Sequence, residues 1–404
     1  MAWSVPVIFC RRFTILCHNR LPMKKIQVLF HDAGGGHRNA AFALQTVITQ
    51  QNRGWQVELV QFQELTDRLD VLRRLTGIRI QEQYNSLLRN GWTLGATQLL
   101  RALQATIWVF HKPLVKLLAD YFRKHGGDLL VSVIPHFNRE IAEAWELANP
   151  GRPFVTLITD IADFPPHFWI EPVENQYVIC GSEKAAEQAR VIGKDAAHIF
   201  RTSGMILRPD FYVPENVDPL ALRRELGLRP DVTTGMLLFG GFGSKVMLGI
   251  VEQLNATKLP VQLIVICGRN DKLAAELRAR QWSLPLHVLG FTKEVHQLMR
   301  GADFLIGKPG PGSVAEAMIR KLPVILECNA WTLPQERYNT EWVKEKKVGI
   351  VLEDFKDIVG GVKQMLAPGA LAGFRRNMER LENRAIFEVP AIFAKLLGEA
   401  PQPD

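Results

Sequence analysis

The chain has 404 residues, of which 47% are hydrophobic and 22% charged, a composition typical of a globular protein with two domains. The formal net charge of +8 favours an anionic partner, but no zinc-finger, helix-turn-helix or basic–aromatic pattern favours nucleic acid. The five cysteines are scattered without a Cys-x-x-Cys pair, which argues against a disulfide framework and a structural zinc site. No run of about 18 apolar residues predicts a membrane-spanning helix.

Residues 1–22 contain three arginines and no acidic residue. Two interpretations of them stay open. They are a targeting segment, or they are an upstream extension ahead of a natural start at Met23. The predicted N-terminal domain covers residues 23–205 in either case.

The N-terminal half alternates predicted strands and helices. An apolar strand at 26–30 leads into the glycine loop Gly34, Gly35 and Gly36, and a helical pattern follows from residue 38 to 50. Further strands are predicted at 56–62, 129–134, 154–159 and 177–180. This alternation predicts a parallel, doubly wound sheet, whose ligands bind at the carboxyl ends of the strands.

Residues 81–122 interrupt this rhythm with an apolar stripe at helical spacing: Leu99, Leu103, Ile107, Phe110, Leu114 and Leu118. One interpretation is an interfacial helix that contacts lipid through Trp92, Trp108 and Phe110 and anionic head groups through Lys112 and Lys116. The other is a core-facing helix with a solvated basic side. In either case Pro113 is expected to kink or divide the segment.

Residues 206–232 contain four prolines and are predicted to be a loop-like linker between the domains. Strands predicted at 236–239, 261–267, 287–289, 304–306 and 324–326 then alternate with helices, which indicates a second Rossmann-like domain over residues 233–404. The last helix is expected to pack back on the N-terminal domain. The predicted fold class is α/β, with two doubly wound domains facing a cleft.

His37 is the candidate catalytic residue of the N-terminal half. It follows the glycine loop, and an imidazole at the mouth of a cleft can take a proton from an acceptor hydroxyl. Asp160 ends a predicted strand and is expected to orient that imidazole or to help bind the acceptor. The alternatives are that His37 caps the helix and that Asp160 is a turn residue.

The C-terminal half contains three loops of the kind that bind phosphate. Gly240, Gly241 and Gly243 follow one strand, and Arg269 and Asn270 follow another, with a cation suited to diphosphate. The third is the turn Gly310, Pro311, Gly312 and Ser313. Ser313 is expected to be the N-cap of a helix over 314–320, which would form an anion site.

Acidic and amide side chains near these loops predict sugar contacts. Glu316, one turn into that helix, is suited to accept hydrogen bonds from a ribose, and Gln335 and Glu336 are suited to grip sugar hydroxyls. Each of these features alone also fits an ordinary capping box, turn or helix start. No Asp-x-Asp motif is present, so helix N-termini and cations are expected to hold the diphosphate without metal or other cofactor.

Together these stretches resemble the monogalactosyldiacylglycerol synthase family of glycosyltransferases and, more distantly, the N-acetylglucosaminyl transferase of peptidoglycan lipid-intermediate synthesis. The resemblance runs in the family's order from about residue 24 to 350 and includes residues 31–38, 158–160, 204–209, 238–241, 266–270 and 307–317. It implies the GT-B fold and a UDP-sugar donor in the C-terminal domain, with diphosphate at 310–313, ribose at Glu316, sugar at Gln335 and Glu336, and uracil beside Phe291. It makes His37 the base or acceptor-positioning residue.

The expected activity is therefore inverting transfer of a hexose from a UDP-sugar to a membrane lipid, 1,2-diacylglycerol above all. Pro309, Ser313 and the Arg-Tyr-Asn that follows Glu336 depart from the plant pattern, so galactose and glucose both stay open. The expected location is a peripheral one on the cytoplasmic side of a membrane, or on a plastid-type membrane if residues 1–22 are a targeting segment. The alternatives are another lipid acceptor such as a polyprenyl, a UDP-sugar epimerase without lipid acceptor, or a silent binding protein.

Overall fold

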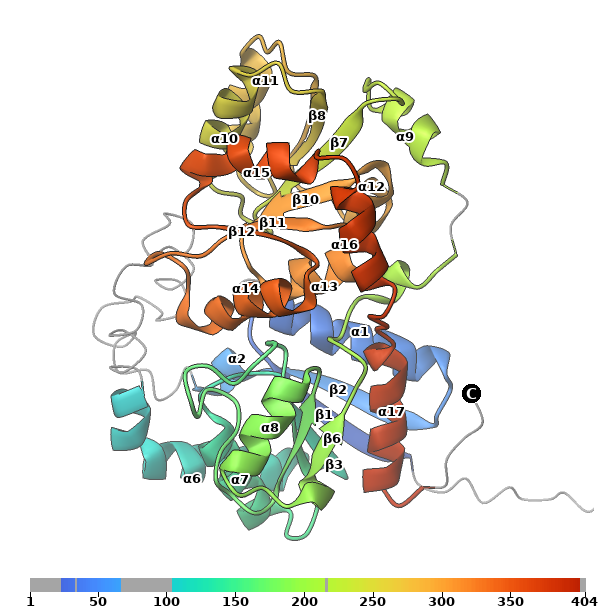
Figure 1. Cartoon of the computed structure of the whole chain (residues 1–404). Coiled ribbons are helices and arrows are strands. Elements are labelled where there is room, and N and C mark those ends of the chain that lie inside the picture. Colours follow the sequence, from blue (N-terminus) through green and yellow to red (C-terminus); the bar gives the residue numbers. More distant parts are fainter. Residues whose placement is uncertain (1–22, 33–34, 67–103, 215–216, 400–404) are drawn as a thin grey trace, which may run out of the picture.

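The computed structural model describes residues 23–32, 35–66, 104–214 and 217–399. The expectations for residues 1–22, Gly34 and Trp92 lie outside these ranges. Two parallel six-stranded sheets, each with helices packed on it, form the two halves of the molecule (Figure 1). The α/β class and the two doubly wound sheets predicted from the sequence are thus confirmed.

The N-terminal sheet has the strand order β2-β1-β3-β4-β5-β6. Its strands are β1 (Lys24–Phe30), β2 (Trp55–Gln61), β3 (Leu129–Ser132), β4 (Phe154–Leu157), β5 (Gln176–Cys180) and β6 (Ile199–Arg201). The main helices are α1 (Gly36–Gln50), α2 (Phe62–Thr66), α6 (His111–His125), α7 (Asn138–Ala148) and α8 (Glu183–Val191), with η1 (Ala196–His198) before β6. The central strands are buried on both faces because helices cover both.

The C-terminal sheet has the order β12-β11-β10-β7-β8-β9. Its strands are β7 (Thr233–Leu238), β8 (Val261–Ile266), β9 (Leu286–Leu289), β10 (Phe304–Gly307), β11 (Val324–Glu327) and β12 (Gly349–Leu352). Its helices are α10 (Val246–Asn255), α11 (Asp271–Ala279), α12 (Val295–Leu298), η3 (Met299–Gly301), α13 (Pro311–Ile319), α14 (Pro334–Lys346), η4 (Phe355–Asp357), α15 (Ile358–Met365) and α16 (Ala370–Met378). Strands β6 and β12 were not predicted. Strand β6 has only three residues and gives little apolar signal, whereas β12 was missed although its residues Gly349–Leu352 are all apolar.

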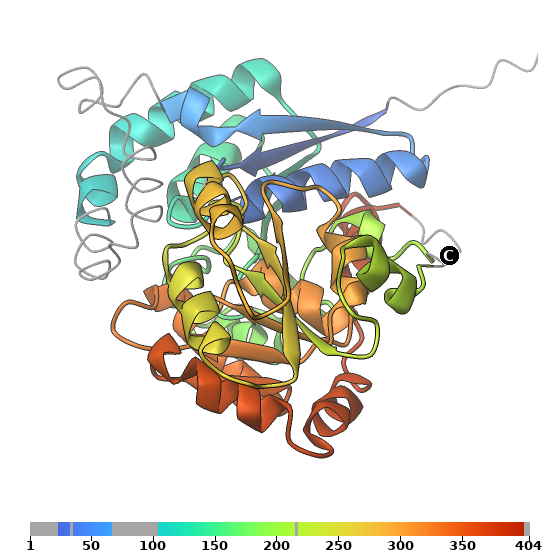
Figure 2. The same cartoon turned by 90° about the horizontal axis from the view of Figure 1, so that it is seen from above.

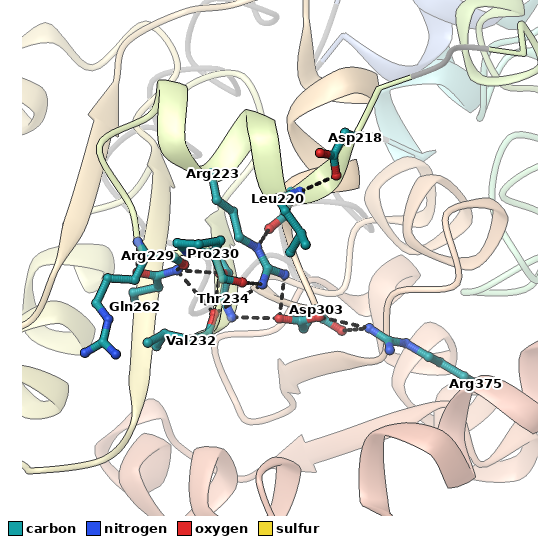
Figure 3. A network of polar contacts seen from close by, with 11 residues as sticks. Asp218, Leu220, Arg223, Arg229, Pro230, Val232, Thr234, Gln262, Asp303 and Arg375 are labelled. Atoms are coloured by element: carbon teal, nitrogen blue, oxygen red, sulfur yellow. Dashed lines mark hydrogen bonds and ion pairs between the residues drawn. The ribbon is translucent and has the colours of Figure 1, made fainter.

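The stretch 206–232 is not a loop throughout. It contains η2 (Pro209–Phe211) and α9 (Pro219–Glu225), which begins with Asp218 as N-cap and Pro219 in the first turn. The buried Arg223 of α9 donates to the Gly301 carbonyl at 2.8 Å and to Asp303 at 2.7 Å (Figure 3). Asp303 also accepts from the Thr234 amide, so this network ties α9 to the C-terminal sheet (Figure 3).

The last helix, α17 (Ala385–Leu396), leaves the C-terminal half and runs alongside the N-terminal sheet (Figure 1). Its Ile386, Val389 and Phe393 are fully buried in a cluster with residues of β1 and α1 such as Val28 and Leu44. The chain therefore crosses between the two halves twice, once at 201–219 and once before α17.

The apolar stripe around α6 faces the protein core. Ile107, Leu114 and Leu118 are buried. Of the two interpretations of the stripe, the core-facing helix therefore holds for these three residues. The helix is interrupted at Phe110, and Pro113 lies in the first turn of α6, so the predicted division occurs. Trp108 and Phe110 remain exposed, at 75% and 38%. In the described part of the chain, no helix is long and apolar enough to cross a bilayer.

The surfaces that the two sheets turn toward each other carry α1, α13 and α14 (Figure 1). Seen from above in Figure 2, the N-terminal strands β1 and β2 and helix α1, in blue, extend past the C-terminal sheet along the upper edge of the view. These helices follow β1, β10 and β11, so they begin at the carboxyl ends of their strands. In a parallel sheet this edge is where ligands bind.

Candidate active site

The turn between β10 and α13 exposes backbone donors at the interface of the two halves. Helix α13 begins one turn earlier than predicted, with Gly310 as N-cap and Pro311 as its first residue. The predicted Ser313 cap is wrong, because proline's fixed φ and missing N–H suit the first helical position. The Gly312 and Ser313 amides precede the first intrahelical bond, which runs from the Val314 amide to the Gly310 carbonyl. They are available to an anion.

The other two predicted phosphate loops pack directly against each other. Gly243 and Gly268 have φ of 61° and 58°, and a side chain at either would clash with the other loop's backbone, at Cys267 and Gly241. The Arg269 amide donates to the Gly241 carbonyl at 2.9 Å. Glycine is therefore required at both positions for the loops to fit together.

The side chains on the second of these loops have partners already. The Asn270 carboxamide caps α11 by accepting from the Leu273 amide at 3.1 Å. The Arg269 guanidinium lies 5.1 Å from the centre of the Phe291 ring, which is itself 55% exposed. Arg269 and Phe291 thus form one exposed cation–aromatic surface rather than a cation directed at the Gly310 turn.

Glu316 lies one turn into α13, as expected, and is partly buried. Burial raises the pKa of its carboxyl to about 7, and the Arg208 guanidinium opposes this rise. Arg208 comes from the crossing segment and donates to the Lys293 carbonyl at 3.0 Å, two residues after Phe291. Arg208 thus interacts both with Glu316, the predicted ribose contact, and with the loop that contains Phe291, the predicted uracil contact.

Helix α14 is bound to the Gly310 turn by side-chain contacts. The Asn339 amide donates to the Pro309 carbonyl at 2.7 Å. Glu336 is 7% exposed and accepts from the Lys308 ammonium at 3.0 Å. Gln335, its neighbour, lies in the first turn of α14 and is partly buried. The predicted sugar-binding pair is therefore positioned beside the predicted diphosphate turn.

His37 lies in the first turn of α1, and the helix is capped by the backbone of Gly35, at φ 87°, rather than by this side chain. Gly36 is exposed. The His37 Nδ1 atom is 3.1 Å from the Thr159 hydroxyl, and its ring centre lies 5.6 Å from that of Trp169. Burial lowers the pKa of His37 to about 4, partly offset by a hydrogen bond to the Val133 backbone. The imidazole is neutral at physiological pH, the form that accepts a proton.

Two more histidines surround His37. Burial, with repulsion from the neighbouring imidazoles, lowers the pKa of His31 to about 3 and that of His136 to about 4. His136 has a positive φ of 70°, and among the described residues the buried Nδ1 atoms of His31 and His136 have no hydrogen-bond partner. These neutral rings form one wall of the N-terminal side of the site.

Asp160 forms no direct contact with His37, so it does not orient that imidazole directly as expected. Its Oδ2 atom accepts from the Trp169 indole at 2.9 Å. Burial raises the pKa of Asp160 to about 7, repulsion from Glu336 adds to the rise, and attraction to Lys308 opposes it. Asp160 of one half therefore faces the Lys308–Glu336 pair of the other, which places the two candidate sites across one interface.

The structure thus brings most predicted residues together around this interface. The sequence prediction missed Thr159, Trp169 and Lys308, which hold His37, Asp160 and Glu336 respectively. Lys308 was visible at the start of the Gly-Pro-Gly turn motif, whereas no local pattern marks Trp169. Across the described residues, no cluster of His, Cys, Asp or Glu is suited to hold a metal ion.

One family model and several known proteins are similar to this chain. Residues 237–360 match the glycosyltransferase family 28 C-terminal domain. The monogalactosyldiacylglycerol synthase of Spinacia oleracea is 30% identical over 86% of this chain and 67% of its own length.

Among solved structures, Acinetobacter baumannii MurG superposes with a TM-score of 0.60 at 12% identity, covering 92% of this chain and 99% of MurG. Anabaena Alr3699/HepE in complex with UDP-glucose superposes with a TM-score of 0.52 at 16% identity. The superposition covers 92% of this chain and 99% of HepE. The chain has the GT-B fold and belongs to the monogalactosyldiacylglycerol synthase family of glycosyltransferases.

Proposed function

We propose that the protein transfers a hexose, galactose or glucose, from a UDP-sugar to the hydroxyl of diacylglycerol or a related membrane lipid, with inversion at the anomeric carbon. The observation that carries this proposal is the Gly310–Ser313 turn, whose Gly312 and Ser313 amides precede the first intrahelical bond, together with the neutral His37 imidazole in the other half. The relatives named as monogalactosyldiacylglycerol synthases and the UDP-glucose complex of HepE support the lipid and the donor class.

The donor fits the C-terminal half. The diphosphate would lie on the amides of Gly312 and Ser313, with Gly240, Gly241 and Gly243 on its other side. Glu316 would accept from the ribose, Phe291 would border the uracil beside Arg269 and Asn270, and Gln335 and Glu336 would hold the sugar. Pro311 fixes the direction of the turn.

The acceptor fits the N-terminal half. Gly35 and Gly36 leave space for a hydroxyl to approach the His37 imidazole. With a pKa near 4, His37 is a weak base, so it takes the proton only as the acceptor oxygen bonds to C1 and its O–H becomes acidic. Asp160 acts indirectly, through the Trp169 indole that packs on the His37 ring.

The lipid acceptor requires contact with a membrane. Trp108 and Phe110 are exposed just before α6, and Lys112 and Lys116 are exposed in its first two turns. The segment lies at the periphery of the molecule in both views (Figures 1 and 2). Exposed aromatics next to lysines suit an anionic bilayer surface, so we propose peripheral binding to the cytoplasmic side of a membrane, or to a plastid-type membrane.

The test uses purified protein with labelled UDP-galactose or UDP-glucose and diacylglycerol in mixed micelles. We expect labelled monohexosyl-diacylglycerol by mass spectrometry, with UDP release that depends on the lipid. If an isomerised UDP-sugar forms in the absence of lipid, the protein is an epimerase and the transferase proposal is wrong. No UDP release with diacylglycerol or a polyprenyl lipid would make the protein a binding protein.

A further inference from the structure

Lys308 occupies a position that the donor and acceptor assignments leave unexplained. It lies between β10 and α13, and its side chain runs between two of the glycine turns. A methyl group placed on Gly240 would lie 3.5 Å from Lys308 Cε, and one on Gly310 would lie 3.6 Å from the same atom. The end of this side chain is therefore adjacent to both backbone segments proposed to hold the diphosphate.

The ammonium group keeps donors available for a ligand. Within the described ranges it donates one hydrogen bond, to Glu336 Oε1 at 3.0 Å, and an ammonium has three N–H donors. The side chain of Lys308 is 38% exposed, whereas that of Glu336 is 10% exposed. The carboxylate thus holds the cation from the protein side while the rest of the ammonium faces the interface between the halves.

An acidic residue of the other half interacts with this pair. Asp160 is 6% exposed and interacts electrostatically with both Lys308 and Glu336. The Lys308 ammonium thus bonds one carboxyl group of its own half and interacts electrostatically with one of the other half. These interactions place Lys308 where the donor and acceptor halves meet.

The other cations near the donor are engaged elsewhere. Arg269 lies over the Phe291 ring, and Arg208 is bonded to the Lys293 carbonyl and pairs with Asp210 at 3.3 Å. Both belong to the uracil and ribose end of the proposed donor. Lys308, by contrast, lies beside the Gly310 turn.

We propose that Lys308 stabilises the negative charge that develops on the leaving diphosphate, held for this task by Glu336. The inference rests on the proposed transferase activity. The bond between C1 of the sugar and the β-phosphate oxygen breaks, and that oxygen keeps the electron pair. The acceptor oxygen bonds to C1, and its proton passes to His37. Lys308 takes no part in the proton transfer and acts by charge, as a fixed cation does where charge develops in a partly closed site.

The experiment compares the wild type with Lys308→Met, which keeps the length of the side chain and removes its charge. We expect kcat to fall about 100-fold with a much smaller change in KM for the UDP-sugar. Binding of UDP, measured by calorimetry, should weaken roughly tenfold, whereas binding of uridine, which has no phosphate, stays unchanged. A purely structural lysine would affect UDP and uridine alike.

Three further variants separate charge from folding. Lys308→Arg should retain the preference for UDP over uridine. The double variant Lys308→Met with Glu336→Gln leaves no unpaired buried charge, and it should show the same loss of UDP preference as the single variant. Lys356→Met, which removes an exposed lysine paired with Asp354, should behave as wild type.

Two results would overturn the assignment: kcat of Lys308→Met within about threefold of wild type, or equal weakening of UDP and uridine. Failure of the proposed function is recognised separately. If wild-type protein transfers no sugar to any lipid, the transferase proposal fails, while the UDP and uridine affinities of the variants still decide whether Lys308 contacts the diphosphate.

Discussion

Asp160→Asn should stabilise the folded protein, increasingly as the pH rises. The carboxyl is 6% exposed, and burial raises its pKa from 3.8 to about 7. Between these two values the folded state holds a proton that the unfolded state has lost. The stability of the wild type therefore falls as the pH rises through this window and is constant above it. Asparagine carries no charge and keeps an oxygen for the Trp169 indole.

The size of the effect follows from the shift. Between pH 5 and the folded pKa of about 7, the pH rises by about two units while Asp160 is protonated only in the folded state. The stability advantage of Asp160→Asn over the wild type should therefore grow by about 2.7 kcal/mol from pH 5 to pH 8. Urea unfolding of both proteins at pH 5, 6, 7 and 8 measures this difference. Trp169→Phe, which removes the hydrogen bond but not the carboxyl, serves as a comparison. An advantage that stays constant or shrinks with pH would show that Asp160 is ionised in the folded protein at pH 5, and would refute the reasoning.

The remaining predictions concern the two substrates and the membrane. His37→Ala should lower kcat by about 10²- to 10⁴-fold and leave UDP affinity unchanged, and near-normal turnover would remove His37 from the chemistry. Glu316→Ala should raise KM for the UDP-sugar about tenfold with little change in kcat, measured in mixed micelles at saturating lipid; unchanged donor saturation would exclude the ribose contact. Replacing the exposed Trp108 and Phe110 together by Ser should weaken sedimentation with anionic vesicles several-fold, while activity on a micellar acceptor persists. Retained vesicle binding would place the membrane contact elsewhere.

Local sequence patterns predicted most of the sheet architecture. Buried parallel strands such as β3 and β8 are short apolar runs that end at turn residues, and this signal does not depend on the rest of the fold. Strand β6 was missed because a three-residue strand is defined mainly by its pairing with β5. Helix α9 was missed because prolines suggested a loop, although Pro219 lies at the first helical position, where proline is favourable.

The candidate site was predictable where one loop defines it and less so where several elements meet. The glycine turns were visible because their backbone geometry demands glycine locally, as at Gly243 and Gly268. The partner of Asp160 was not predictable, because Trp169 reaches it only through the packing of the segment after β4. The link from Lys308 to Glu336 joins residues 28 positions apart, and no spacing rule reveals it.

The central claim is that the main-chain amides after Gly310 hold the diphosphate of a sugar donor opposite His37. A crystal structure of the protein with UDP tests it most directly. We expect the β-phosphate at hydrogen-bond distance, about 3 Å, from the Gly312 or Ser313 amide, with Glu316 on the ribose. A diphosphate bound at Gly35 and Gly36 instead, or on the outer face of the C-terminal sheet, would contradict the account.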